Sequence, residues 1–270
     1  MKHKLLYFGF IIGIILIIFI FIYNYKEPFT IPITFLTKDE TIDFILKDED
    51  NYIKNLTIFD LRARKTGTTD EYLYKSARNA LEFTQEQKDK LTICANEAYN
   101  YFNNNFTWIF ALMSSEYEDG YPHTRSNIIF ISPSIINYDN TELIKTLIHE
   151  SIHIYQRYNK TAIETYLIEN GFNKKSNRYI ATIEDYNINK CNNNSSINKN
   201  LIRANPDLDE FIYTDKDGVE MASYYNSEFP NGINDATSKS SYGEHPFEYI
   251  AYTIAGNYSK QILDSYKNKI

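Results

Sequence analysis

The feature that most constrains this fold is an apolar pattern at helical spacing from Leu143 to Tyr155, which covers more than one face. Such a helix has to be buried, because water would otherwise contact apolar side chains around most of its circumference. Asp139 or Asn140 can cap its start. Ionisable residues interrupt the pattern in the run His149-Glu150-Ser151-Ile152-His153. Buried polar side chains need partners, so the pattern predicts a polar site inside the molecule.

The spacing of the two histidines is that of a metal site. Residues four apart lie on one helix face about one turn from each other, where the imidazoles of His149 and His153 can bind a single Zn2+. Glu150 occupies the neighbouring position, from which a carboxylate can take a proton from a metal-bound water. We therefore predict that His149 and His153 are zinc ligands and that Glu150 is a catalytic general base. A chance match is rare in a chain with five histidines.

A catalytic zinc usually has three protein ligands and an open position for water. The metzincin pattern, with a glycine and then a third histidine after the motif, is excluded because those positions hold Gln156 and Asn159. Two glutamates stand at the start of a later predicted helix, Glu244 and Glu248. We predict Glu248 as the third ligand, because Ala251 one turn later leaves room for close packing against the motif helix. Glu244 stays as the alternative, with Glu248 then accepting a hydrogen bond from a ligand histidine.

Two other residues are candidates for contact with a substrate. His123 precedes a predicted strand and could reach a substrate carbonyl or a developing oxyanion. Arg203 is a weaker candidate of the same kind. Both have a simpler interpretation as solvated loop residues.

The segments before the motif helix predict both helices and strands. Capping boxes at Thr37 to Glu40 and Thr84 to Gln87 begin helices, so residues 37–105 are predicted to form a helical N-terminal portion. Apolar runs at Phe106 to Met113 and Asn127 to Ser132 are predicted strands. Together with the motif helix, these elements predict an α+β fold.

The C-terminal half predicts a further helix, a polar insertion, a hairpin and a last helix. Glycine, proline and Asn-rich stretches separate these elements. The predicted elements are, in order, a helix over Thr161 to Glu169, a loop over Asn187 to Asn200, strands over Glu210 to Thr214 and Val219 to Tyr225, a loop over Gly232 to Tyr242, and a helix from Pro246.

Residues 5–23 form a stretch of nineteen residues without a charge, which as a helix would be roughly 28 Å long and could span a bilayer. Tyr23 to Lys26 follow it in place of small residues, so an uncleaved anchor is favoured over a signal peptide. Lys2 and Lys4 predict a cytoplasmic N-terminus and a catalytic domain that is lumenal or extracellular, for example on a virion membrane. The predicted division is an anchor over 1–25, a linker over 26–36 and one domain over 37–270.

The composition narrows the class of partner. The net charge of -7 provides no positive field for nucleic acid, so no nucleic-acid partner is predicted. With 43% hydrophobic residues the chain is expected to fold, and an aromatic share of 16% is high enough for a dense core. Cys94 and Cys191 lack metal-ligand spacing; they could form one disulfide, but a buried thiol is the commoner explanation of Cys94.

The motif at His149 to His153, the strand before it, and Glu248 with Ala251 together resemble the zincin metallopeptidases, nearer the branch whose third ligand is a glutamate. The resemblance covers roughly residues 106–158 and 242–255. It implies a zincin-like domain whose small sheet has an edge strand for extended substrate, with the motif helix beneath the sheet. It also implies zinc between the motif helix and the later glutamate-bearing helix.

The predicted function is that of a membrane-anchored zinc metallopeptidase, which hydrolyses a peptide or protein substrate with a zinc-activated water. The alternative is a non-catalytic structural or adhesion protein of zincin-like shape, in which His245 could be the fourth ligand of a closed site. Glu150 favours catalysis, because a structural zinc needs no general base. A metal-free binding module is the third interpretation.

Overall fold

The computed structural model describes residues 31–103, 106–177 and 211–267. The chain divides into two units, Met1–Pro32 and Ile33–Ile270, and every element described below belongs to the second. Its described part contains eight α-helices and three small sheets, so the predicted α+β class is confirmed. The finer prediction of a zincin-like domain is taken up under the proposed function.

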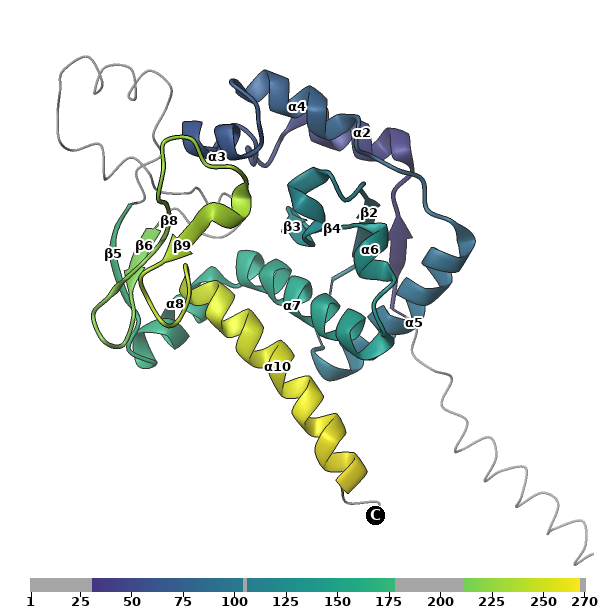
Figure 1. Cartoon of the computed structure of the whole chain (residues 1–270). Helices are drawn as coiled ribbons and strands as arrows, with labels where there is room; N and C mark the ends of the chain where they lie inside the picture. The colour runs from purple at the N-terminus through teal and green to yellow at the C-terminus, as the bar shows by residue number, and fades with distance from the viewer. Residues whose placement is uncertain (1–30, 104–105, 178–210, 268–270) are drawn as a thin grey trace, which may run out of the picture. The chain divides into compact units, whose positions relative to one another are not determined.

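The central sheet has four strands in the order β1-β2-β4-β3 (Figure 1). The strands are β1 (Ile33–Phe35), β2 (Trp108–Leu112), β3 (His123–Arg125) and β4 (Ile128–Ile131). The first three in the sheet order are parallel, and β3 is antiparallel to β4 at the edge. The two predicted strands correspond to β2 and β4. β1 lies within residues 26–36, the segment predicted as a linker.

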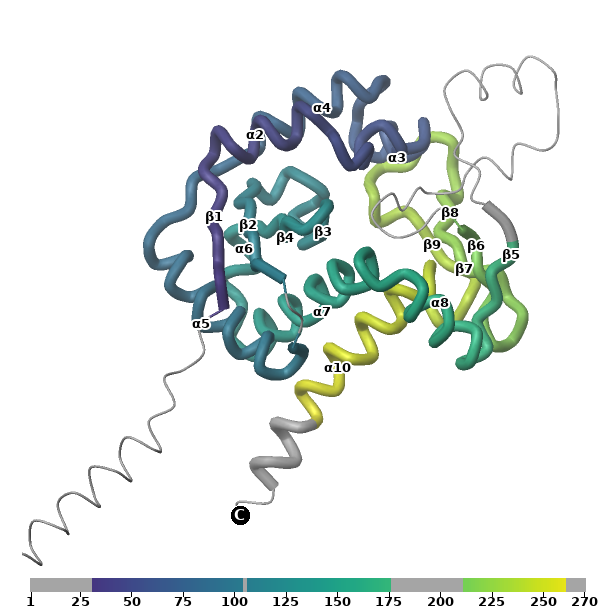
Figure 2. The backbone as a smooth tube through the Cα atoms, turned by 180° about the vertical axis from the view of Figure 1, so that it is seen from behind, coloured from purple at the N-terminus to yellow at the C-terminus, as the bar shows by residue number. Residues whose placement is uncertain are grey.

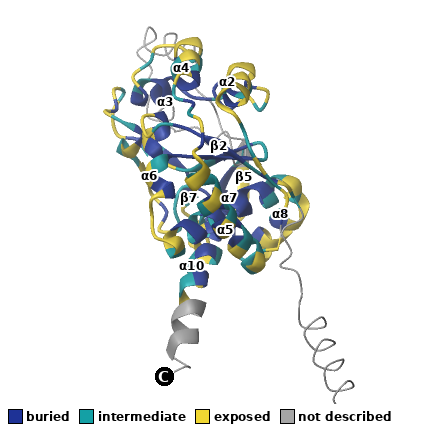
Figure 3. Ribbon diagram, turned by 90° about the vertical axis from the view of Figure 1, so that its right-hand side faces the viewer, coloured by how far each residue is buried: buried dark blue, intermediate teal, exposed yellow. Residues whose placement is uncertain are grey.

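Helices cover both faces of this sheet. All four residues of β4 are buried, which requires apolar neighbours on both sides because successive strand residues point to opposite faces. On one face Phe130 belongs to a core cluster with Ile45 of α2 (Lys38–Lys47) and Tyr72 of α4 (Thr69–Ala77). Figure 3 shows β2 as part of a buried layer between exposed helical surfaces.

On the other side of the sheet lie α5 (Gln85–Tyr101) and α7 (Asn140–Tyr158), as Figure 1 shows. These two helices pack against each other, and α6 (Pro133–Ile136) connects β4 to the segment before α7. The predicted motif helix is therefore present and buried, and Asp139 caps it through hydrogen bonds to its side chain from the N–H groups of Thr141 and Glu142.

The helices of the N-terminal portion begin at threonine caps. The predicted capping boxes at Thr37 and Thr84 are both formed. A third box, Thr57 with Asp60, begins α3 (Ile58–Ala63), and Thr68 caps α4. The sequence analysis predicted neither α3 nor α4, although each carries the same local signal.

The C-terminal part forms two small sheets beside α8 (Lys160–Glu169), which matches the predicted helix. The predicted hairpin at Asp217-Gly218 is present as β6 and β7. The prediction of loop over Gly232 to Tyr242 is wrong, because a 3-10 turn and β9 lie within it. The elements are β5 (Asn173–Asn177), β6 (Phe211–Thr214), β7 (Glu220–Met221), β8 (Ser223–Tyr225), the 3-10 turn Ile233–Asp235 and β9 (Ala236–Ser238).

The last helix, α10 (Pro246–Lys267), begins at the predicted proline and runs beside α7 (Figure 2). Seen from either side, the two helices lie together on the same side of the sheet (Figures 1 and 2). This packing brings the start of α10 next to the C-terminal half of α7, where the two histidines of the motif lie.

The predicted membrane location requires a correction. Within the described ranges, no helix combines the length and the apolar character needed to cross a bilayer. The predicted single-pass membrane protein is therefore not supported. The predicted span over residues 5–23 lies outside the described ranges, as do the Asn187 to Asn200 loop, Arg203 and Cys191. Cys94 is a buried free thiol.

Candidate metal centre

One face of α7 carries His149 and His153, one turn apart. The two Nε2 atoms are 3.0 Å from each other, and the rings meet edge to face. His153 is buried and His149 is partly exposed. Both imidazoles therefore turn their Nε2 atoms toward the same point, as the spacing of four predicted.

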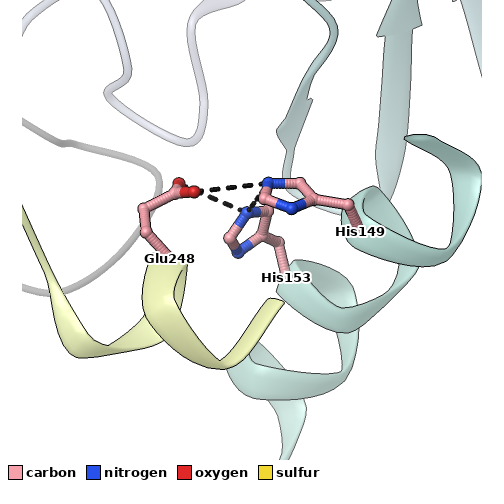
Figure 4. A group of neighbouring side chains, drawn as sticks. All are labelled: His149, His153 and Glu248. Carbon is pink, nitrogen blue, oxygen red and sulfur yellow. Dashed lines mark hydrogen bonds and ion pairs between the residues drawn. The ribbon is translucent and has the colours of Figure 1, made fainter. Parts of the chain in front are cut away.

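Glu248, in the first turn of α10, completes the group (Figure 4). Its Oε2 lies 3.3 Å from His149 Nε2, and its Oε1 lies 3.3 Å from His153 Nε2. The start of α10 is held by His245, whose Nδ1 accepts a hydrogen bond from the Phe247 N–H at 3.2 Å. The structure thus brings together the three residues predicted as metal ligands.

The donor atoms of this group suit a tetrahedral zinc. Ligand atoms at about 2.0–2.1 Å from zinc lie about 3.3 Å from one another in a tetrahedron. Each histidine nitrogen lies at this distance from a different oxygen of the Glu248 carboxylate, and the His–His separation is slightly shorter. Within the described residues, this is the group of His, Cys, Asp and Glu side chains close enough to hold a metal ion. Three protein ligands leave a fourth position open.

The two histidines also keep Glu248 ionised. Burial raises the pKa of this carboxyl, but the charge of protonated His153 and hydrogen bonds from the protonated imidazoles of both histidines outweigh burial, so the pKa lies well below its usual value. An anionic oxygen is the form in which a carboxylate binds a metal ion.

Glu150 lies beside the group but does not belong to it. Its side chain is only 2% exposed and lines a cavity shared with His149, His153 and Glu248. The hydroxyl of Thr124, on β3, donates to Glu150 Oε2 at 2.7 Å. This bond leaves the other carboxylate oxygen for a different partner and orients the carboxylate against the edge strand.

The cavity has a volume of about 530 Å³ and borders the metal group. Its lining includes Tyr252 of α10, whose ring centroid lies 4.4 Å from that of His149. Tyr252 stands one turn after Glu248 and is 69% exposed. Burial of part of the ring and the nearby Glu248 carboxylate raise the pKa of the phenol to about 12, so it remains a hydrogen-bond donor at neutral pH.

The remaining predicted residues occupy different places. Glu244 lines the cavity, but it is not part of the group that can hold a metal ion. His123 is a residue of β3 and not of a loop, and its ring stacks on Phe130 at 5.2 Å. His123 also lines the cavity and is partly buried.

The wall of the cavity away from the metal group contains charged residues in pairs. Glu118 accepts hydrogen bonds from Arg64 through both carboxylate oxygens and from the Tyr72 hydroxyl. A second buried arginine, Arg125, is not among the residues that line the cavity and donates to Asp48 and Asp50 at 2.7 Å each. Each of these buried arginines is therefore neutralised by carboxylates of the same chain.

Sequence analysis missed three residues of the site: Thr124, Tyr252 and Gln156. Gln156 is buried and hydrogen-bonds to His153. The positions of Tyr252 and Gln156, four residues after Glu248 and three after His153, put each on the face of its ligand, so helical spacing could have identified both. No local signal marks Thr124, because its bond to Glu150 joins a strand to a helix.

Comparison of the chain with models of known protein families, with curated proteins and with solved structures found no match.

Proposed function

We propose that this protein is a zinc-dependent metallopeptidase of the HExxH type, in which His149, His153 and Glu248 hold the metal ion. The observation that carries the proposal is the convergence of two imidazole nitrogens and one carboxylate, with contacts of 3.0–3.3 Å, beside a buried glutamate that is not one of the three residues. A closed structural site has four protein ligands. The group of three therefore favours a catalytic centre over a purely structural one.

The described side chains can be given roles from their positions. Zinc in this site would polarise a carbonyl and lower the pKa of a water to about 7. Glu150 would take the proton from that water and pass it to the leaving nitrogen. Thr124 orients Glu150 through the 2.7 Å hydrogen bond. Tyr252, protonated at neutral pH, would donate to the oxygen that becomes negative in the transition state.

A peptide is the substrate that the surroundings favour. β3 is an edge strand, and its residue His123 lines the cavity. An extended peptide can add to such an edge through main-chain hydrogen bonds. The carbonyls of Thr124 and Ser126 already accept from Arg157 at 2.7 and 2.6 Å, so pairing would use the start of the strand. An edge strand over a motif helix, with a later glutamate-bearing helix, is also what a zincin-like domain implies.

The first test measures zinc bound per molecule of the full chain by elemental analysis, after dialysis against a low concentration of Zn2+. We expect about one zinc ion in the parent protein and its loss in His153→Ala and in Glu248→Gln. Glu244→Gln is the matched control, because it makes the same change four residues earlier on the cavity wall, and it should keep the zinc.

Two results would contradict the proposal at different points. A folded parent that binds no zinc would remove the metal centre. A zinc ion lost in Glu244→Gln and retained in Glu248→Gln would keep the centre but replace its third ligand. Hydrolysis is then assayed separately by incubating the zinc-loaded protein with a mixture of unrelated peptides and identifying the products by mass spectrometry. A stoichiometric zinc ion without cleavage of any peptide would favour the structural alternative.

A further inference from the structure

The amide of Gln156 links the two helices of the metal centre. Its side chain is only 1% exposed. The amide nitrogen donates to the carbonyl oxygen of Phe247 at 3.0 Å, and the amide oxygen lies 2.9 Å from His153 Nδ1. Phe247 directly precedes Glu248 on α10, whereas Gln156 and His153 are on α7. A single side chain therefore contacts a ligand on one helix and the backbone beside a ligand on the other.

The first of these bonds determines the orientation of the amide. The Phe247 carbonyl oxygen can only accept, so the amide group has to present its nitrogen there and its oxygen to His153. An amide oxygen can only accept as well. His153 must then carry its proton on Nδ1, which leaves the lone pair of Nε2 directed at His149 and Glu248.

His149 has no equivalent support in the described residues. Its Nδ1 is buried and has no hydrogen-bond partner, so no protein group holds the proton on that nitrogen. The two histidines of the site thus differ: Nδ1 of His153 has an acceptor that fixes its proton, and Nδ1 of His149 has none.

We infer that Gln156 is a positioning residue that pre-organises the metal centre, by selecting the metal-binding tautomer of His153 and by holding the start of α10, with Glu248, against α7. The inference rests on the proposed metal site and adds to it a residue that is not a ligand. A simpler role as a buried amide with satisfied hydrogen bonds would affect the stability of the protein but not the tautomer or the intrinsic zinc affinity.

The tautomer can be measured in the metal-free parent protein without any substitution. Histidine labelled with 15N gives distinct nitrogen chemical shifts for the two neutral tautomers, and His153→Ala identifies the signal. We expect the proton of His153 on Nδ1 at a pH where the ring is neutral. A proton on Nε2 would overturn the inference directly, whatever the variants do.

The contribution to zinc binding is tested with two variants of similar shape. Gln156→Met removes both hydrogen bonds, whereas Gln156→Glu lacks the donor to Phe247 but keeps an acceptor for His153 Nδ1. Competition with a chelator, with Zn2+ alone as the probe, should show 10- to 100-fold weaker binding by Gln156→Met. Gln156→Glu should recover most of this loss. Equal affinities of the Met and Glu variants would contradict the role of the acceptor.

A matched amide elsewhere serves as the control. Asn79 also donates to a backbone carbonyl, that of Lys75, and accepts from a side chain, the Ser114 hydroxyl. Asn79→Leu should lower the thermal midpoint while leaving the zinc affinity of the folded protein unchanged. If the parent protein binds no zinc, both the metal centre and this inference are refuted. If the parent binds zinc and Gln156→Met binds it equally tightly, the metal centre stands and only the inference is refuted.

Discussion

Two groups of ionisable side chains line the same cavity, and they differ in how their polar atoms are satisfied. In the wall of the cavity away from the metal group, Arg64 forms an ion pair with Glu118, so a positive and a negative side chain satisfy one another. In the metal group, His149, His153 and Glu248 direct two imidazole nitrogens and a carboxylate toward one point. The first arrangement is complete without a ligand, whereas in the proposed site a metal ion would complete the second.

We therefore expect substitutions of the ion pair to change mainly the stability of the protein, and substitutions in the metal group to change mainly its proposed function. Breaking a buried ion pair leaves an uncompensated charge and destabilises the folded state. In the proposed site, removing a metal ligand would change zinc affinity and activity. The predictions below therefore use both unfolding and catalysis as measurements.

The largest expected effect is that of Glu150→Gln on catalysis. The substitution keeps the shape of the side chain and removes its ability to accept a proton, so kcat should fall by roughly 10² to 10⁴. Zinc content and the free energy of unfolding should stay close to those of the parent. A variant with more than half of the parent activity would show that Glu150 is not the general base.

In the cavity wall away from the metal group, Glu118→Ala should destabilise the protein by about 3–5 kcal/mol. The substitution leaves the buried Arg64 without its carboxylate partner, which is itself only 6% exposed. Denaturant unfolding measures the change. Glu142→Ala is the matched substitution, since it breaks an ion pair with Lys145 on the more exposed side of the cavity, and it should cost less than about 1 kcal/mol. Equal costs would remove the distinction between the buried and the exposed pair.

The same carboxylate predicts a dependence of stability on pH. Burial raises the pKa of Glu118, but the charge and hydrogen bonds of Arg64 outweigh this effect and lower the pKa from 4.5 to about 2. The stabilisation is therefore complete above pH 4.5 and is lost as the pH falls toward 2, by about 3 kcal/mol in all. Unfolding of metal-free protein between pH 5 and pH 2 measures it. Glu118→Gln should show a shallower loss in this window, and an identical slope would contradict the prediction.

Tyr252→Phe tests whether the proposed site stabilises the transition state with a hydrogen-bond donor in addition to the metal ion. The variant keeps the ring that packs on His149 and removes only the hydroxyl, so zinc affinity should not change. We expect kcat to fall by about 10², as for the loss of one donor to an oxyanion, with KM almost unchanged. A fall in zinc affinity in place of kcat would show that the tyrosine only supports His149.

Thr124→Val should have the smallest effect. It replaces the hydroxyl that donates to Glu150 by a methyl group of similar size, and a hydrogen bond of this kind contributes about 1–2 kcal/mol. We expect a fall in kcat of roughly five- to thirty-fold, with zinc content unchanged. Thr124→Ser keeps the hydroxyl and should retain most of the activity. Equal kcat values for the two variants would show that the hydrogen bond does not position Glu150.

Sequence patterns identified those parts of the molecule whose determinants are local. The helical period and the Asp139 cap predicted α7, and spacing of four placed His149 and His153 on one face. Pro246 marked the start of α10, which carries Glu248. Each of these signals lies within a few residues along the chain, where backbone geometry relates spacing to position directly.

The features that were missed depend on contacts between distant segments. Arg125 and Asp48 are 77 residues apart, and Arg64 and Glu118 are 54 apart. Nothing in the neighbourhood of either arginine predicts that it will be buried. The sheet order is equally non-local, because β1 joins the sheet beside β2 more than seventy residues later in the sequence. Only the assembled fold shows which charges meet.

The separation of Glu248 from the histidine pair has a consequence for the production of the protein. Glu248 follows His153 by 95 residues. A chain that is still being synthesised, and has not yet reached α10, contains both histidines and Glu150 but lacks the third donor. If the proposed site is correct, such a chain would hold zinc poorly and remain inert, so hydrolysis would begin only after α10 has been made and has packed against α7.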